Sequence, residues 1–113
     1  MSGTQKQKID LLRGTVDLMI LRILELQPLH GIAIADRIRQ STKGAFHIQA
    51  GSLFPALHRL EQEGWIAGEW TTNEKARRIK SYRLTASGSR QLSEEKRTWE
   101  RVVAAVTQVL DIR

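Results

Sequence analysis

Residues 51–66, GSLFPALHRLEQEGWI, predict the helix from which the rest of the fold is inferred. Pro55 lacks an amide hydrogen and is harmless only in the first turn of a helix, so we expect a helix to begin near residue 51 or 52. At 100° per residue, the leucines of this helix share one face: Leu53, Leu57 and Leu60. Gly64 is expected to end the helix.

The opposite side of this helix offers groups that can bind nucleic acid, with one histidine at its margin: Ser52, Pro55, His58, Arg59 and Gln62. Arginine pairs well with guanine and glutamine with adenine, so these side chains are candidates for base or backbone contacts. Arg59 has a second interpretation, because it can also form an ordinary surface ion pair with Glu63 four residues on.

The hydrophobic period changes after Gly64. Residues 65–72 and 79–84 are rich in β-branched and aromatic residues and predict two strands joined by residues 73–78. Residues 71–83 hold five basic and one acidic side chain, which gives +4 of the total charge of +6. We expect the cations of this hairpin to bind phosphates, although they could also serve solubility alone: Lys75, Arg77, Arg78, Lys80 and Arg83. Trp65 and Trp70 are interpreted as packing residues.

Two helices are predicted upstream. The first follows Thr15, a plausible N-cap, and runs to the turn at residues 27–31, where Pro28 ends it. The second covers residues 32–40, and residues 46–48 fit either a loop or a minimal strand. Residues 1–10, MSGTQKQKID, are interpreted as a flexible polar tail.

A final helix is predicted after Thr85, its expected cap. Its apolar residues recur at intervals of seven, which suits packing against a partner helix. We therefore expect it to be a dimerisation helix over residues 86–113, with these interface residues: Leu92, Trp99, Val102, Val103, Val106, Val109 and Leu110.

The order of elements predicts a mainly α fold with a small β-hairpin. Helices two and three form a helix-turn-helix, and the basic hairpin supplies the wing of a winged helix-turn-helix domain over residues 11–85. In that arrangement the third helix enters the major groove of DNA and the hairpin lies along phosphates.

Composition narrows the function classes. A chain of 113 residues without cysteine fits one domain with no disulfide framework or thiolate metal site. The pI near 10.3 favours polyanionic partners. No stretch is apolar enough for a signal peptide or a membrane span, so we expect a cytoplasmic protein. The histidines show no zinc spacing, and no nucleophile elbow or phosphate loop occurs, so we expect neither an enzyme nor a cofactor or metal site.

Three segments in the same order resemble the PadR family of transcriptional regulators: Leu29–Ile34, Gly51–Ile66 and Tyr82–Gly88. In the middle segment a small residue, a leucine, an aromatic residue and a proline precede a Leu-x-x-Leu-x-x-x-Gly pattern. With their surroundings the segments cover roughly residues 11–110. The resemblance implies a homodimeric winged-helix repressor whose C-terminal helix packs against the partner protomer.

The resemblance bears in particular on Phe54 and Trp99. The family usually has tyrosine at the position of Phe54, and phenylalanine cannot make the backbone contact of that hydroxyl. Trp99 is interpreted as a dimer anchor or, because some compact relatives bind flat aromatic compounds near a tryptophan of this helix, as part of an effector pocket between protomers.

The sequence thus predicts a regulator that binds double-stranded DNA sequence-specifically. We expect a homodimeric repressor on a near-palindromic operator, with release by a small aromatic effector as an added prediction. The alternatives are a winged helix that binds an acidic protein and, less favoured, one that binds structured RNA.

Overall fold

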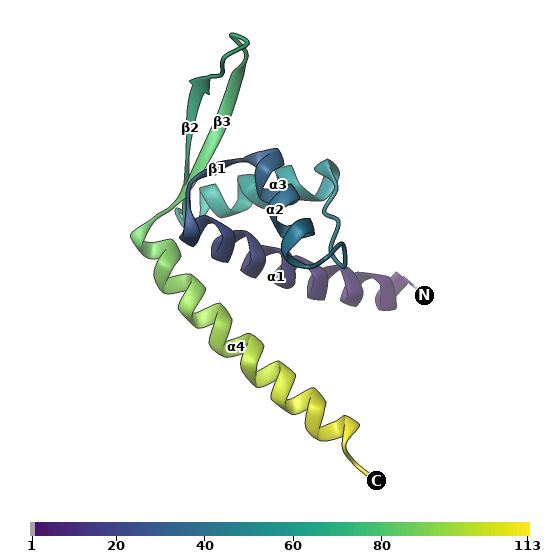
Figure 1. The fold of residues 1–113 in the computed structure, drawn as a ribbon. Helices are drawn as coiled ribbons and strands as arrows, with labels where there is room; N and C mark the ends of the chain where they lie inside the picture. Colours follow the sequence, from purple (N-terminus) through teal and green to yellow (C-terminus); the bar gives the residue numbers. More distant parts are fainter. Residues whose placement is uncertain (1) are drawn as a thin grey trace.

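The computed structural model describes residues 2–113, with side chains from residue 14 onward. The elements follow the predicted order: α1 (Ser2–Leu26), β1 (Leu29–His30), α2 (Gly31–Ser41), α3 (Ala50–Gln62), β2 (Ile66–Thr72), β3 (Arg78–Leu84) and α4 (Ala86–Leu110). Figure 1 shows a body of three helices, a hairpin of β2 and β3 that projects from it, and α4 extending away in another direction. The mainly α winged-helix class is confirmed.

The core lies where α1, α2 and α3 meet. Side chains with at most 1% exposure come from each of these helices: Ile20, Leu21, Ile34, Ile38, Leu53, Leu57 and Leu60. The predicted leucine face of α3 is therefore its buried face. Gly64 ends the helix region with a φ of +77°, a backbone conformation that glycine adopts without strain.

α3 begins at Ala50, slightly earlier than predicted, which places Pro55 in its second turn. Proline removes the amide that would bond to the Gly51 carbonyl. Because Gly51 and Pro55 both lie on the exposed side of α3, water can satisfy this carbonyl. The proline is tolerated for that reason.

The prediction for the start of the first helix was wrong. α1 begins at Ser2, so Thr15 lies inside the helix and residues 2–10, predicted as a tail, are helical. Glutamine, lysine, leucine and arginine dominate residues 5–13 and are good helix formers, and no proline interrupts them. A single interior glycine, Gly14, costs only about 1 kcal/mol and does not stop a helix.

A short strand that the sequence did not reveal completes the sheet. β1 pairs antiparallel with β3, with Leu29 opposite Tyr82 and His30 opposite Ser81, and the strand order is β1-β3-β2. A two-residue strand shows no periodicity of its own and depends on the partner strand. The other candidate, residues 46–48, lies in a loop.

α4 is fixed to the body at its first turns. Thr85 Oγ1 accepts a hydrogen bond from the Gly88 amide at 3.0 Å, which confirms the predicted cap, and donates one to the Gly64 carbonyl at 2.6 Å. A Cβ on Gly88 would lie 1.9 Å from the Trp65 carbonyl oxygen, so only glycine allows this close approach. The end of α3 and the start of α4 are thus joined directly.

Candidate nucleic-acid interface

The exposed side of α3 carries most of the helix residues predicted to contact DNA. Ser52, Pro55, His58 and Gln62 are exposed. Pro55, His58 and Gln62 lie within about 60° of one another on the helical projection, and Ser52 lies on one flank. No element of the described chain covers this surface, so it is available to a ligand.

Arg59 is directed elsewhere. Its Nη2 donates a hydrogen bond to Asp17 Oδ1 on α1, and the two side chains are 32% and 14% exposed. The ion pair therefore joins α3 to α1 and lies partly shielded from water. Arg59 was predicted to read a base or to pair with Glu63, and the structure gives it a different partner, far away in the sequence.

The register of β2 and β3 decides which side chains of the wing face α3. Opposed pairs alternate between the two faces of the hairpin. The face that begins in the core carries, from base to tip, four pairs: Ile66 with Leu84, Gly68 with Tyr82, Trp70 with Lys80, and Thr72 with Arg78. This face turns toward α3, because Lys80 on it pairs with Glu61 of α3. Arg83, which was also predicted to bind phosphate, pairs with Ala67 and therefore lies on the other face of the hairpin.

Glu61 binds both strands of the wing. Its Oε1 accepts from Lys80 Nζ at 2.8 Å, and its Oε2 accepts from the Gly68 amide at 3.2 Å. The hydrogen bond between the Lys80 ammonium group and Glu61 raises the pKa of Lys80 above its usual value of 10.5. Burial raises the pKa of the neighbouring Tyr82. Lys80 was predicted to bind phosphate, but in the structure its ammonium group pairs with Glu61 and joins the wing to α3.

Trp70 is exposed, contrary to the packing role predicted for it. Its side chain is 55% exposed. The Arg78 guanidinium carbon lies 4.7 Å from the centre of the indole ring and Lys80 Nζ lies 5.7 Å from it, both within range of a cation–π interaction. Trp65 does pack against the core, as predicted.

The tip of the wing presents the remaining predicted cations. Lys75 and Arg77 are exposed, and their backbone amides both donate to Asn73 Oδ1 at 3.0 Å. Ala76 between them has a φ of +60°, which completes the tight turn. The turn holds the two side chains at the end of the hairpin farthest from the body.

The predicted dimerisation residues separate into two groups. Leu92 is 1% exposed in the core of its own protomer, so that prediction was wrong: the first turns of α4 lie on the body. The other six are at least 41% exposed: Trp99, Val102, Val103, Val106, Val109 and Leu110. They form a continuous apolar stripe at three- and four-residue spacing along α4.

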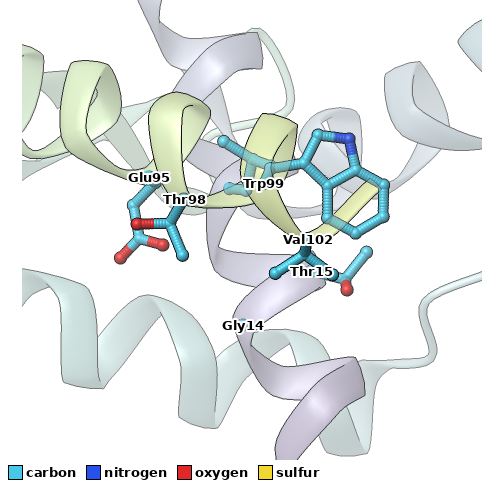
Figure 2. A pocket seen from close by; sticks show the side chains of 7 residues that line it. Gly14, Thr15, Glu95, Thr98, Trp99 and Val102 are labelled. Carbon is cyan, nitrogen blue, oxygen red and sulfur yellow. The ribbon is translucent and has the colours of Figure 1, made fainter. Parts of the chain in front are cut away.

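Trp99 and Val102 also line a shallow hollow against α1. Figure 2 shows these side chains beside Gly14 and Thr15, with Glu95 and Thr98 at the other end. The hollow measures about 160 Å³. Pockets for drug-sized ligands usually measure about 300–1,000 Å³, so the hollow of one protomer is smaller than such a pocket.

No cluster of three or more histidine, cysteine, aspartate or glutamate side chains within the described residues could hold a metal ion. Among the described helices, none has the length and apolar character to cross a membrane.

Comparisons with known proteins agree with this geometry. The sequence model of the transcriptional regulator PadR-like family matches residues 20–94. The transcriptional regulator Rv3488 of Mycobacterium tuberculosis is 30% identical over 95 residues, 83% of this chain and 84% of its own length.

Solved structures give the same result. A transcriptional regulator from Clostridium thermocellum is 29% identical with a TM-score of 0.81, covering 88% of this chain and 96% of its own. A PadR family transcriptional regulator from Eggerthella lenta is 28% identical with a TM-score of 0.81, covering 99% and 96%.

Proposed function

Since the chain belongs to the PadR-like family of transcriptional regulators, we propose that this DNA-binding protein acts as a homodimeric repressor on a near-palindromic operator. Each protomer would place the exposed side of α3 in a major groove, with the wing on the neighbouring backbone. Pro55, His58 and Gln62 would face the base edges, and Ser52 would bind at the flank.

The proposal is carried by one observation: the exposed side of α3 and the cation-bearing face of the wing lie next to each other. The uncovered side of α3 and the cation-bearing face of the wing lie on either side of the Glu61 contact. Lys75, Arg77 and Arg78 add positive charge beyond it, within residues 71–83, which hold +4 of the total charge of +6. A polar helix face beside a cationic hairpin fits a duplex, whose sequence is read in the groove and whose phosphates bind cations.

The apolar stripe of α4 supports the homodimer. Six large apolar side chains, each at least 41% exposed in the protomer, form the kind of contiguous patch that marks a protein interface. We propose that a second copy covers them through its own α4. Two-fold symmetry would then place the two α3 helices about one helical turn of DNA apart.

The hollow at Trp99 supports an effector site between protomers. Two such hollows facing each other across the dimer axis would enclose a space that one protomer leaves open, and the indole offers a flat surface for stacking. We propose a small aromatic compound as its ligand. Titrating aromatic compounds into the protein while following Trp99 fluorescence tests this, with Trp99→Phe as the control that must lose the signal.

The repressor proposal is tested by footprinting on the DNA upstream of the genes that flank its own. We expect two protected half-sites about 10 base pairs apart, centre to centre. Binding to that DNA with no preference over random duplex would contradict a specific operator, and activation of transcription in a reconstituted assay would contradict repression.

A further inference from the structure

The end of α3 and the start of α4 meet in a joint formed by Gly64, Trp65, Thr85, Ser87 and Gly88. The Gly64 carbonyl accepts hydrogen bonds from Thr85 Oγ1 at 2.6 Å and from Ser87 Oγ at 3.0 Å. The Trp65 carbonyl accepts one from the Thr85 amide at 3.1 Å. Because a carbonyl oxygen has two lone pairs, the two hydroxyl groups use the full capacity of Gly64.

Gly88 is the point of closest approach in the joint. A Cβ at this position would lie 1.9 Å from the Trp65 carbonyl oxygen and 2.8 Å from Leu84 Cδ1. The nearer of these atoms belongs to the main chain, so a side chain at residue 88 would fit only if α4 moved away from Trp65. Alanine favours a helix more than glycine does, so α4 would stay helical during that movement. Gly88 therefore fixes where α4 lies, and the helix itself does not need it.

The direction of α4 is set within its first two turns. Leu92 is 1% exposed in the core, whereas every residue from 96 to 110 is exposed in the protomer. Beyond Leu92, α4 faces α1 across the shallow hollow at Trp99. Figure 1 shows the rest of α4 extending away from the body. A change at the joint would therefore change the angle between α4 and the body.

We propose that Thr85, Ser87 and Gly88 set the distance between the two α3 helices of the homodimer, and that they thereby select operators by the spacing of the half-sites. The inference rests on the proposed function and adds three positioning residues to it.

Two-fold symmetry makes this distance sensitive to the joint. In a dimer held through the α4 stripes, each body is attached to its stripe through its own joint. α3 has 13 residues. It therefore extends roughly 20 Å from the joint, and a tilt of about 10° moves its far end by roughly 3 Å. The same tilt in both protomers can double the change in separation. Since base pairs are about 3.4 Å apart, such a tilt corresponds to a spacing change of about one to two base pairs.

The test measures the distance between the two α3 helices directly. The chain has no cysteine, so Ser52→Cys, on the exposed side near the far end of α3, provides one site for a spin label. Pulsed electron paramagnetic resonance on the labelled homodimer, without DNA, gives the distance between the two labels. Ser87→Ala and Gly88→Ala are introduced into this background. Ser93→Ala is the matched control, because the Ser93 hydroxyl donates to the Ser89 carbonyl within α4.

We expect one narrow distance distribution for the unchanged joint and for Ser93→Ala. Gly88→Ala should shift the distance by about 3–6 Å, since the main chains must separate. Ser87→Ala should broaden the distribution, because the Gly64 carbonyl loses one of its two donors, and Ser87→Thr should restore it. Distributions of Gly88→Ala and Ser87→Ala that both match the unchanged joint would overturn the inference. If Gly88→Ala does not fold, the comparison of Ser87→Ala with Ser87→Thr decides in the same way.

A DNA measurement keeps the two proposals apart. Anisotropy titrations compare the footprinted duplex with two duplexes in which one base pair is added or removed between the half-sites. We expect the wild type to bind both altered duplexes roughly tenfold more weakly, because their half-sites are displaced along the helix axis and rotated about it. Gly88→Ala should lose this discrimination while remaining dimeric in sedimentation velocity.

Equal discrimination by the wild type and Gly88→Ala would overturn the role of the joint and leave DNA binding intact. A wild-type protein that is monomeric, or that binds no duplex at low salt, would overturn the proposed function itself.

Discussion

Arg59 has a role in the structure that differs from the predicted one. Its ion pair with Asp17 joins α3 to α1, and both side chains are partly shielded from solvent. An exposed ion pair contributes up to about 1 kcal/mol to stability, and breaking a buried one costs about 3–5 kcal/mol. We expect the contribution of this partly buried pair to lie between these values. We therefore assign Arg59 mainly to the stability of the helix arrangement.

Replacing Arg59 by alanine should lower the free energy of unfolding by roughly 1–3 kcal/mol, because the partly buried ion pair that joins α3 to α1 is lost. Urea denaturation of the variant measures the loss. Gln62→Ala, on the exposed side of the same helix, is the control and should leave stability within about 0.5 kcal/mol while changing base preference. Wild-type stability in Arg59→Ala would contradict the assignment.

The pKa shifts of Lys80 and Tyr82 predict a loss of stability at alkaline pH. Glu61 raises the pKa of Lys80 above 10.5, so the stabilisation is complete below that value and disappears as pH rises through the folded-state pKa. Burial raises the pKa of Tyr82 above 10.0, so tyrosine ionises first in the unfolded chain and favours unfolding.

We accordingly expect the free energy of unfolding to fall as pH increases above about 10. Denaturant titrations between pH 8 and pH 11 measure this. Glu61→Gln removes the cause of the lysine shift, so its stability should decline less steeply over the same range. Parallel declines in the two proteins would show that the Lys80–Glu61 pair does not contribute.

At the residue scale, the sequence identified exposed and buried positions on α3 but not long-range partners. Leucine spacing places Leu53, Leu57 and Leu60 in the core without further information. The pairing of Arg59 with Asp17 depends on how α1 crosses α3, and local periodicity does not contain that angle. Trp70 lies opposite Lys80 in the hairpin, so both side chains are on the same face. This could not be predicted because the sequence alone did not give the register of the two strands.

At the scale of elements, Glu61 sets the position of the wing relative to α3. One carboxylate accepts hydrogen bonds from Gly68 on β2 and Lys80 on β3. DNA binding needs both elements in one arrangement, so a loose wing would pay an ordering cost on binding. Glu61 is therefore a positioning residue, although its charge repels phosphate.

The positioning role of Glu61 predicts that removing its negative charge weakens DNA binding. Removing an acidic residue near DNA should by charge alone strengthen binding, but we expect Glu61→Ala to weaken it about three- to tenfold because the wing loses its attachment. Glu63→Ala is the charge-matched control: Glu63 is exposed, and its loss should leave affinity equal or slightly higher. Anisotropy titrations on one duplex compare the two variants, and tighter binding by Glu61→Ala would refute the positioning role.

The elements differ in how far the sequence determined them. α3 and the hairpin were predicted closely, because proline, glycine and the change of period mark their ends. The start of α1 was missed, since Thr15 resembles a cap but the residues before it form helix equally well. β1 was missed because its two residues gain their hydrogen bonds only from β3.

At the scale of the whole molecule, α4 extends from the body (Figure 1). The exposed apolar side chains of its C-terminal half form a stripe along it. Val106 lies in the middle of that stripe, and Gln108 lies on the opposite side of the helix. We expect Val106→Asp to shift the protein to a monomer at micromolar concentration, because a charge would be buried without a partner.

Sedimentation velocity measures the oligomeric state of this variant. Gln108→Asp adds the same charge on the solvent side and should stay dimeric. Loss of the dimer should also weaken DNA binding strongly, since each protomer then binds one half-site alone. A Val106→Asp protein that remains dimeric would place the interface elsewhere.

The salt dependence of DNA affinity for the wild-type protein tests whether α3 and the wing form one DNA-binding surface. If α3 and the wing together contact about 6–10 phosphates in the dimer, the association constant should fall by roughly 10³–10⁵ between 50 and 200 mM salt. A linear plot of log K against log salt concentration with a slope of about −5 to −9 would match the cations of the two wings. An affinity that does not change with salt would contradict a DNA-binding surface made of α3 and the wing.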